Sequence, residues 1–469
     1  STTLITTTTT ITIRRCRRIL PPGCGITRTF ASSLGTTNAP RIAVVGGGIT
    51  GTFASLVLKN RGLSPLLIDS GRNGVGGRLR GGGGRVGDLR YADGGAQFFR
   101  ASEPKLQTVL TMLERSGMLT KWEGRFGLLG SQAGGFLPVD VVKHVTGLPG
   151  SDPNNNKEEE EETAIPAAAT DAGDFCGFVQ NYNDTTTTYV GVPTNADLCP
   201  QICSMAGIDV VGGRKVTRAI PQKDGSWQLQ FEGSNEADQL LFDGLIMATH
   251  DPSLVAATVR SIVEESKDQE KNTIVHERLT RLANDLQAIR DDGRLPLFTW
   301  TGMLPTDVST QLPFDAVSVP GSQKLQFLAR ESSKRVGVPN DDEGEVWTAV
   351  STSAFAADLL NRFGGKSKEA SQEAALQLSN EISSLIQSSS MENVTPKNSS
   401  AARWASALTS KTLELKEDSI LLTPWRLAIG GDYIREKSSP FEAAALSGLE
   451  AGERVAALFQ QVDDESQPQ

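Results

Sequence analysis

The segment that decides the fold reads Ala43-Val-Val-Gly-Gly-Gly-Ile-Thr-Gly51. Residues 42–45 form a short apolar run, the size of a buried parallel strand. Gly46, Gly48 and Gly51 follow as G-x-G-x-x-G. The first glycine permits a tight turn, the second lets the backbone approach a pyrophosphate, and the third lets a helix pack closely on the strand. The segment therefore predicts the first strand, turn and helix of a Rossmann-like domain.

The residues after the turn continue this pattern. Apolar side chains recur at helical spacing from Ile49 to Val57, and Gly62 is a suitable end for the helix. The N-terminus of such a helix carries unpaired N–H groups and about half a positive charge, which suits a phosphate. Thr50 adds a hydroxyl there. A second apolar run, residues 66–68, ends in Asp69, where the fold expects an acid on the ribose hydroxyls.

Asp69 limits the choice of dinucleotide. A carboxylate and a 2′-phosphate about 4 Å apart repel by about 4 kcal/mol at an effective dielectric near 20, which disfavours NADP. This argument does not separate NAD from FAD. The continuation of the chain does, because Gly76-Gly-Arg78 follows Asp69 closely and Asp93-Gly-Gly-Ala-Gln-Phe98 comes next.

These two segments resemble the flavin-containing amine oxidase superfamily, in which a G-G-R segment follows the acidic ribose ligand and its arginine contacts the cofactor. Glycines around it allow the backbone to approach closely. The sequence contains no motif for covalent attachment of a flavin. The resemblance therefore implies non-covalent FAD, with these binding residues in the first 100 positions: Gly46, Gly48, Thr50, Gly51, Asp69, Gly77, Arg78, Ala96 and Gln97.

The C-terminal part of the chain fits the same site. Leu427-Ala-Ile-Gly-Gly-Asp-Tyr433 looks like a last strand that runs into a Gly-Asp turn, and Pro440 then precedes an alanine-rich helix. In the superfamily, Gly431 and Asp432 would lie beside the ribityl chain and the pyrophosphate. The helix would point its N-terminus at the flavin, where its dipole would stabilise negative charge.

Within the superfamily, the chain is similar to the renalase family and its plant and bacterial members. The resemblance covers about residues 41–459, with inserts, and it implies that the backbone of Val216 meets the adenine. Val216 alternates with polar neighbours before an Asp224-Gly turn, so the residues alone also predict a plain hairpin. The shared segments are Gly76-Gly-Arg78, Asp93-Gly-Gly-Ala-Gln97, Arg214-Lys-Val-Thr-Arg218, Asp224-Gly-Ser-Trp227, Ala402-Arg-Trp404 and Gly430-Gly-Asp432.

The cofactor segments are not contiguous, so we predict an α/β chain, α+β overall. A Rossmann-like FAD-binding domain is expected from residues 41–100, 190–255 and 405–460. A substrate domain with an antiparallel sheet is expected from residues 101–189 and 256–404, with strands at 324–328 and 346–350. Residues 151–163 read as a solvated acidic loop, 388–400 as a polar linker and 461–469 as a disordered tail.

The expected activity follows from the cofactor. Flavin accepts a hydride from a substrate above its ring, and dioxygen reoxidises it. No second G-x-G-x-x-G follows an apolar, strand-like run as the start of a nicotinamide domain would require. The resemblance implies a small substrate, either a dihydronicotinamide or an amine. A different flavoenzyme, such as a desaturase or protoporphyrinogen oxidase, and a flavin-binding protein without turnover are the alternatives.

Catalytic side chains are weakly indicated. Lys324 begins a predicted strand, but its neighbours match no lysine motif, and a surface position is the simpler interpretation. His250 follows a predicted strand at 245–249, where the superfamily approaches FAD, and His144 is a second histidine candidate. Three aromatic residues could line a substrate pocket or simply pack in the core: Trp404, Trp425 and Tyr433.

Composition excludes several classes of protein. The chain has 469 residues, a net charge of -9 and a pI near 5.2, which give no electrostatic footprint for nucleic acid. No window of 18 or more apolar residues predicts a membrane span. Cys199 and Cys203 suit one face of a helix, but no partner residues complete a zinc site, so no metal is expected.

Residues 1–39 read as a targeting segment rather than as part of the fold. They are rich in Thr, Ser and Arg and contain no acidic residue. Such a composition is typical of an organelle transit peptide, and we favour a plastid over a mitochondrion. A disordered tail without a targeting function is the alternative.

Overall fold

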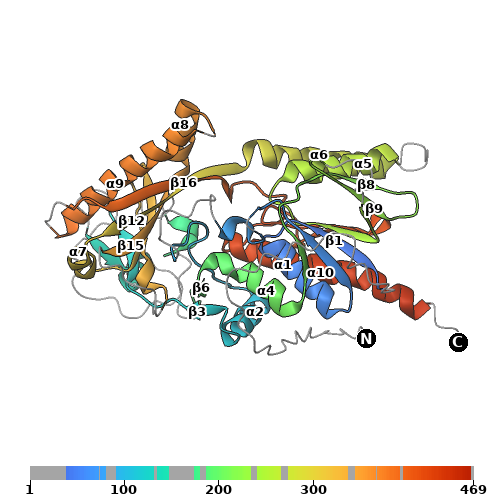
Figure 1. The fold of residues 1–469 in the computed structure, drawn as a ribbon, viewed down its shortest axis with the longest axis horizontal. Coiled ribbons are helices and arrows are strands. Elements are labelled where there is room, and N and C mark those ends of the chain that lie inside the picture. The colour runs from blue at the N-terminus through green and yellow to red at the C-terminus, as the bar shows by residue number, and fades with distance from the viewer. Residues whose placement is uncertain are drawn as a thin grey trace.

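The computed structural model describes residues 39–72, 74–80, 91–130, 135–146, 174–179, 186–233, 240–265, 273–335, 344–365, 367–390 and 394–465. Residues 1–38 of the predicted transit segment, the acidic loop at 151–163 and the last four residues of the predicted tail lie outside the described residues. Figure 1 shows an elongated molecule, with the Rossmann-like half at one end and a large sheet with helices α8 and α9 at the other.

A six-stranded sheet forms the centre of the Rossmann-like half, in the order β17-β18-β11-β1-β2-β7. Strands β1, β2, β7, β11 and β18 are parallel, and β17 pairs antiparallel with β18 at the edge. The strands are β1 (Arg41–Val45), β2 (Ser64–Ile68), β7 (Asp209–Val211), β11 (Gly244–Met247), β17 (Ile420–Leu422) and β18 (Leu427–Ile429). The carboxyl ends of the parallel strands therefore meet along one edge, which is where ligands bind in such sheets.

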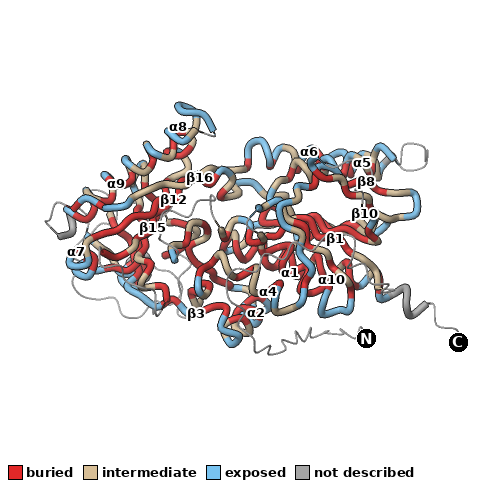
Figure 2. The backbone as a smooth tube through the Cα atoms, viewed as in Figure 1, coloured by how far each residue is buried: buried red, intermediate tan, exposed pale blue. Residues whose placement is uncertain are grey.

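Both faces of this sheet are covered, as the apolar run in β1 predicts. Ile42 and Val44 pack into a core with helices α1 (Ile49–Asn60), α2 (Pro104–Arg115), α4 (Leu198–Ala206) and α10 (Pro440–Glu465). Ala43 and Val45 face the other core, beneath helices α5 (Pro252–Glu265) and α6 (Thr273–Asp292). A three-stranded antiparallel sheet closes that side: β8 (Val216–Pro221), β9 (Trp227–Phe231) and β10 (Leu240–Phe242). Figure 2 shows the resulting band of buried backbone around β1.

The second large sheet has seven strands in the order β16-β12-β15-β14-β13-β4-β5. Every neighbouring pair is antiparallel except β13 and β4, which are parallel. Its strands are β4 (Phe126–Leu129), β5 (Phe136–Pro138), β12 (Arg294–Leu304), β13 (Ala316–Ser318), β14 (Leu325–Arg330), β15 (Glu345–Ser351) and β16 (Lys397–Thr409). The expected strands at 324–328 and 346–350 correspond to β14 and β15. Helices α3 (Val139–Thr146), α7 (Thr306–Gln311), α8 (Ser353–Phe363) and α9 (Lys368–Ser390) accompany this sheet, and β3 (Leu119–Lys121) pairs with β6 (Tyr189–Gly191) beside it.

Three boundaries differ from the sequence-based expectation. Residues 256–265 and 273–292 pack on the Rossmann-like half rather than in the substrate domain, because the apolar faces of α5 and α6 cover its sheet. Two parts of the predicted linker are regular structure, since residues 388–390 belong to α9 and residues 397–400 belong to β16. Helix α10 continues to Glu465, so residues 461–465 are not a disordered tail; no glycine or proline interrupts the helix there.

Candidate functional site

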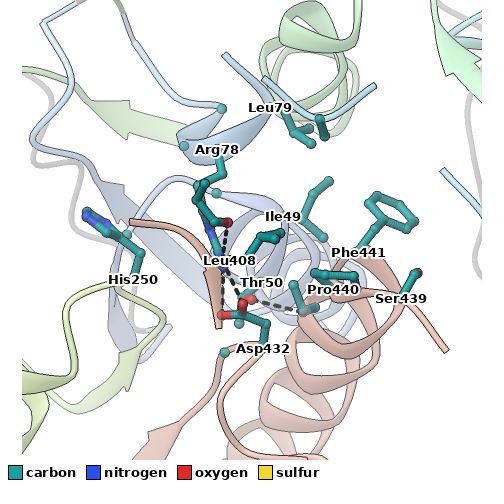
Figure 3. Close-up of a pocket in the computed structure, with 18 of the residues that line it drawn as sticks. Ile49, Thr50, Arg78, Leu79, His250, Leu408, Asp432, Ser439, Pro440 and Phe441 are labelled. Carbon is teal, nitrogen blue, oxygen red and sulfur yellow. Dashed lines mark hydrogen bonds and ion pairs between the residues drawn. The ribbon is translucent and has the colours of Figure 1, made fainter. Parts of the chain in front are cut away.

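A pocket lies at the carboxyl ends of the parallel strands (Figure 3). Counting space that is open to solvent, its empty volume is about 1000 Å³, the upper end of the range for small-molecule sites. Residues within two positions of the ends of four neighbouring strands line it: Gly46 after β1, Asp69 after β2, Ala248 after β11 and Gly431 after β18. The three glycine segments that are far apart in the chain therefore meet in one cavity.

The turn after β1 is built so that a ligand can approach the backbone. Gly46 has φ +114°, and a Cβ there would lie 2.4 Å from the carbonyl oxygen of Ala248, so this position requires glycine. A Cβ on Gly48 would meet nothing within 4 Å, because that position faces the pocket. Ile49 begins α1, and the N-terminus of this helix therefore points its free N–H groups into the pocket.

A second helix N-terminus joins the first. Ser439, Pro440 and Phe441, at the start of α10, line the same pocket. The two helices cross closely, since a Cβ on Gly448 would lie 2.3 Å from the carbonyl oxygen of Thr50. The Thr50 hydroxyl donates to the carbonyl of Ala444 at 2.9 Å. Thr50 thus lines the pocket, but its hydroxyl fixes α1 to α10. Glycine at position 448 therefore allows this close approach.

Asp69 occupies the position expected of a ribose ligand. Its Oδ2 accepts the N–H of Gly47 and its Oδ1 accepts the N–H of Gly71, both at 2.6 Å. The carboxylate is therefore held in one orientation at the wall of the pocket. The N–H of Arg214 donates to the Asp69 carbonyl at 3.1 Å, which brings the segment before β8 to the same corner.

Arg78 and Asp432 form the centre of the site, which we name the pocket cluster: Arg78, Arg294, Thr409 and Asp432. The guanidinium of Arg78 donates to both carboxylate oxygens of Asp432, at 2.6 and 2.7 Å. The Thr409 hydroxyl donates to Oδ2 of Asp432 at 2.6 Å, and Arg294 lies 3.5 Å from Oδ1. Arg294 also donates to Thr409 and to the carbonyl of His250. Two arginines therefore share one carboxylate.

The electrostatics of the pocket cluster follow from its two arginines and single carboxylate. Burial alone would raise the pKa of Asp432, but the charge and hydrogen bonds of Arg78, with Arg294 and Thr409, hold it well below its usual range. His250 is exposed at the pocket edge. Partial desolvation by the pocket wall, followed by the positive charges of Arg78 and Arg294, lowers the pKa of its ring. The site thus favours an ionised aspartate and a neutral histidine.

Behind the pocket lies a second group of charges, which we name the inner cluster: Asp93, Glu331, Lys334 and Arg335. The ammonium group of Lys334 lies 2.8 Å from Glu331 and 3.2 Å from Asp93, and these three side chains are fully buried. Arg335 donates to both acids and to the carbonyl of Gly191, the last at 2.6 Å. The charges of two acidic and two basic side chains therefore cancel within this cluster.

Gln97 connects the inner cluster to the pocket that it lines. Its Oε1 accepts from Lys334 at 3.0 Å, while its Nε2 donates to the carbonyls of Asp93 and Gly95 at 2.6 and 2.8 Å. Ala96 also lines the pocket, and its N–H donates to the carbonyl of Arg78 at 3.2 Å. The predicted Gln97 thus shapes the wall, with its amide committed to protein partners.

Apolar residues close the remaining side of the pocket, which we name the roof: Phe98, Phe175, Cys176, Trp404, Ala407 and Leu408. Phe98 and Phe175 are in edge contact, with ring centroids 6.2 Å apart. Trp404 lies on β16 of the seven-stranded sheet and is 8% exposed. Burial first, and the charge of Asp174 second, raise the pKa of the Cys176 thiol to about 12, so this thiol is uncharged at neutral pH.

Most predicted cofactor residues meet at the pocket, and a few do not. Gly51 lies behind it, where a Cβ would sit 1.9 Å from the Gly46 carbonyl, which fits its predicted packing role. Val216 is not among the lining residues; its side chain packs with Phe231 in the core. The predicted cofactor residues that line the pocket are Gly46, Gly48, Thr50, Asp69, Gly77, Arg78, Ala96, Gln97, Gly431 and Asp432.

Some of the candidate catalytic residues line the pocket and others do not. His250 and Trp404 line the pocket, whereas Lys324 lies before β14 and is not among the lining residues. Tyr433 is fully buried, with its hydroxyl donating to the Gly430 carbonyl at 3.2 Å. Trp425 packs at the edge of the core beneath α5 and α6. The side chain of His144 lies outside the described residues.

Sequence reasoning missed Arg294, Thr409 and the inner-cluster residues after β14. Glu331-Ser-Ser-Lys-Arg335 looks like an ordinary solvated charge run, and no local signal marks Arg294. Cys199 and Cys203 are buried on α4, and the described residues contain no group of three or more side chains suited to a metal ion. No helix in the described part of the chain has the length and apolar character needed to cross a membrane.

Comparisons with known proteins agree with this architecture. Residues 44–113 match the family described as an NAD(P)-binding Rossmann-like domain. No curated protein matches the chain by sequence. Cyclohexylamine oxidase from Brevibacterium oxydans is similar in structure, with a TM-score of 0.57, 14% identity, and coverage of 90% of this chain and 100% of that one.

Two further solved structures have the same arrangement. An oxidoreductase from Methanosarcina mazei gives a TM-score of 0.56 at 10% identity, over 88% of this chain and 100% of its own. A variant of putrescine oxidase gives 0.51 at 12% identity, over 89% of this chain and 99% of its own. The chain therefore has a mixed α/β fold, with a Rossmann-like domain and additional antiparallel sheets, that matches the fold of flavin amine oxidases.

Proposed function

We propose that this chain is an FAD-dependent oxidoreductase, an oxidase that takes a hydride from a small substrate and passes the electrons to dioxygen. One observation carries the proposal: three glycine segments from opposite ends of the chain converge on a single pocket between two helix N-termini. This arrangement suits a long anionic ligand with a flat end, which describes FAD better than a mononucleotide.

The residues present fit such a cofactor. The open side of Gly48 and the N-terminus of α1 suit a pyrophosphate. Asp69 suits the ribose hydroxyls. In the pocket cluster, the Nε of Arg294 is buried and has no hydrogen-bond partner among the described residues, and the cluster carries one more positive than negative charge. An anionic ligand would offset that excess.

FAD bound there would supply a ring that accepts a hydride from a substrate held above it. The protein groups around the ring would do the rest. The roof would exclude water, and Phe98 and Trp404 would orient a substrate against the ring. The partial positive charge at the N-terminus of α10 would favour added negative charge on the bound group.

The resemblance to the renalase family supports a dihydronicotinamide as substrate, with an amine as the other candidate. The fold alone does not choose between them, because Rossmann-like domains serve many reactions. Dioxygen is the favoured acceptor, because only one G-x-G-x-x-G segment of the sequence follows an apolar, strand-like run.

The test is anaerobic stopped-flow reduction of the purified protein. The protein should be yellow. A dihydronicotinamide should rapidly bleach the flavin band at about 450 nm, and peroxide should form when air is readmitted. Bleaching by primary amines alone would instead support an amine oxidase. A protein that purifies colourless and takes up no added FAD would overturn the proposal.

A further inference from the structure

A short turn, residues 174–179, supplies part of the roof, and we name it the roof turn. Its η3 segment (Phe175–Gly177) places Phe175 and Cys176 on the pocket wall. Cys176 has φ +51° and ψ +35°, a left-handed conformation that a residue with a Cβ seldom adopts. Such a conformation persists only where surrounding contacts hold it, and it is found most often at ligand sites. The contacts that hold this turn therefore shape the pocket.

The first anchor of the roof turn comes from the seven-stranded sheet. Ser318, the last residue of β13, donates its hydroxyl to Oδ1 of Asp174 at 2.7 Å and accepts the N–H of Phe175 at 3.1 Å. The two carboxylate oxygens of Asp174 also accept the N–H of Val179, both at 2.9 Å. The negative charge on this side of the roof thus fastens the start of the turn and closes the turn on itself.

The second anchor is the guanidinium of Arg100, which is 3% exposed. Its Nε donates to the hydroxyl of Thr188 at 2.8 Å. One terminal nitrogen donates to the carbonyls of Gly177 and Phe178, at 3.1 and 2.7 Å. The guanidinium carbon also lies 5.1 Å from the ring centroids of Phe98 and Phe178. Arg100 therefore holds the end of the turn, next to the strained residue.

Arg100 reaches the roof turn from another segment of the chain. Phe98, two positions before it, lines the pocket, so one side chain ties the turn to a second part of the roof. A buried carbonyl that loses its donor costs free energy unless water replaces that donor. Without the guanidinium, the turn would gain by opening to hydrate the carbonyls of Gly177 and Phe178. Arg100 is therefore the contact whose removal should release the turn.

We propose that Arg100 is a positioning residue that holds the roof turn closed over the pocket and so limits access to the space beneath it. This inference rests on the proposed function, since it takes that space to contain the flavin ring and the substrate. It applies to either candidate class of substrate, because Arg100 acts on the size and the dryness of the space.

The first experiment labels the full chain with N-ethylmaleimide and follows each cysteine by peptide mass spectrometry. Maleimide reacts with the thiolate, and burial keeps the pKa of Cys176 high, so release of the turn should speed its labelling. Cys199, fully buried on α4 and outside the pocket lining, is the internal reference. Arg100→Met should raise the ratio of the Cys176 rate to the Cys199 rate at least tenfold, about 1.4 kcal/mol of local stability. An unchanged ratio would mean general destabilisation and would overturn the inference.

Two further variants test the contacts of Arg100 as the cause. Arg100→Lys keeps a positive charge and a donor but loses the guanidinium fork, so its labelling ratio should fall between those of the wild type and Arg100→Met. Arg362→Met is the matched control, because Arg362 pairs with Asp358 on α8 and both side chains are exposed. An equal rise of the ratio in Arg362→Met would rule out the specific role of Arg100.

Iodide quenching of flavin fluorescence tests whether the turn covers the ring. In protein loaded with FAD, the quenching constant should be larger for Arg100→Met than for the wild type and Arg362→Met. Faster labelling of Cys176 with unchanged quenching would show that the turn does not cover the ring, which would overturn the positioning role. A protein that takes up no FAD overturns the proposed function instead, and the labelling ratio still decides whether Arg100 holds the turn.

Discussion

The pocket cluster and the inner cluster use the same kinds of side chain for different ends. The inner cluster pairs two acids with two bases, and its side chains are at most 4% exposed. The pocket cluster gives two arginines one carboxylate, and Arg78 remains 23% exposed. A balanced, sealed group joins segments of the fold. An unbalanced group with an open side keeps positive charge for a ligand.

Breaking the inner cluster should give the largest effect on stability. Lys334→Met leaves Asp93 and Glu331 with one cationic partner, Arg335, and removes the contact to Gln97. Unbalancing a buried ion pair in this way costs about 3–5 kcal/mol. Equilibrium unfolding in urea would measure the loss.

Lys105→Met is the matched control for this prediction. Lys105 pairs with Glu453 at 2.9 Å, but the two side chains are 48% and 26% exposed. Exposed pairs of this kind contribute about 0–1 kcal/mol. If Lys334→Met cost no more than Lys105→Met, the distinction between the two clusters would be wrong.

The sequence predicts the Rossmann-like half well because its constraints are local. The turn at Gly46 needs a positive φ, β1 needs apolar residues on both faces, and Asp69 must end the next strand. Each of these requirements falls within a few neighbouring residues. The direct pairing of Arg78 with Asp432 is not predictable in this way, although the sequence assigns both residues to one site.

The inner cluster and Arg294 are not predictable, because their contacts join residues that are far apart in the sequence. Lys334 meets Asp93 across 241 positions of sequence. Lys334 follows β14 of the seven-stranded sheet, whereas Asp93 lies in the segment before α2, outside that sheet, so only the tertiary packing brings them together. The spacing of Glu331, Lys334 and Arg335 is equally suited to a solvated helical turn. The same lack of local signal explains why the sequence pattern places α5 and α6 in the wrong half.

Opening the pocket cluster should affect the ligand more than the fold. Arg78→Ala and Asp432→Ala each remove a partner from the proposed cofactor site, and we expect FAD to bind at least tenfold more weakly, about 1.4 kcal/mol. Flavin occupancy after purification and titration with FAD would measure this. Arg125→Ala, which breaks an exposed contact to Asp315 outside the pocket lining, is the control.

Full flavin occupancy in both pocket-cluster variants would contradict their assignment to the cofactor. Loss of flavin in Arg125→Ala as well would point to general destabilisation instead.

The fall in unfolding free energy at acid pH should depend in part on the pocket cluster. A carboxylate whose pKa is lowered by folding contributes stability above its unfolded value, about 3.9, and loses it as pH falls towards the folded value. Asp432 is such a group, since its arginine partners outweigh its burial. A tenfold fall in the proton affinity of a carboxylate on folding corresponds to about 1.4 kcal/mol of stability.

The unfolding free energies of the wild-type protein and Asp432→Asn should therefore converge as pH falls below about 4. Urea titrations between about pH 6 and pH 2 would show this. A difference that stays constant over the whole range would mean that the carboxylate is not held ionised by its neighbours.

The smallest effect should come from Thr409, whose hydroxyl donates to Asp432 at 2.6 Å while Arg294 donates to it. Thr409→Val removes both contacts but keeps the shape of the side chain, and should cost about 1 kcal/mol. Thr409→Ser should retain most of that stability. FAD affinity should fall less than in Arg78→Ala, since both arginines remain. If Thr409→Val instead released the flavin completely, the hydroxyl rather than the charge excess would control binding.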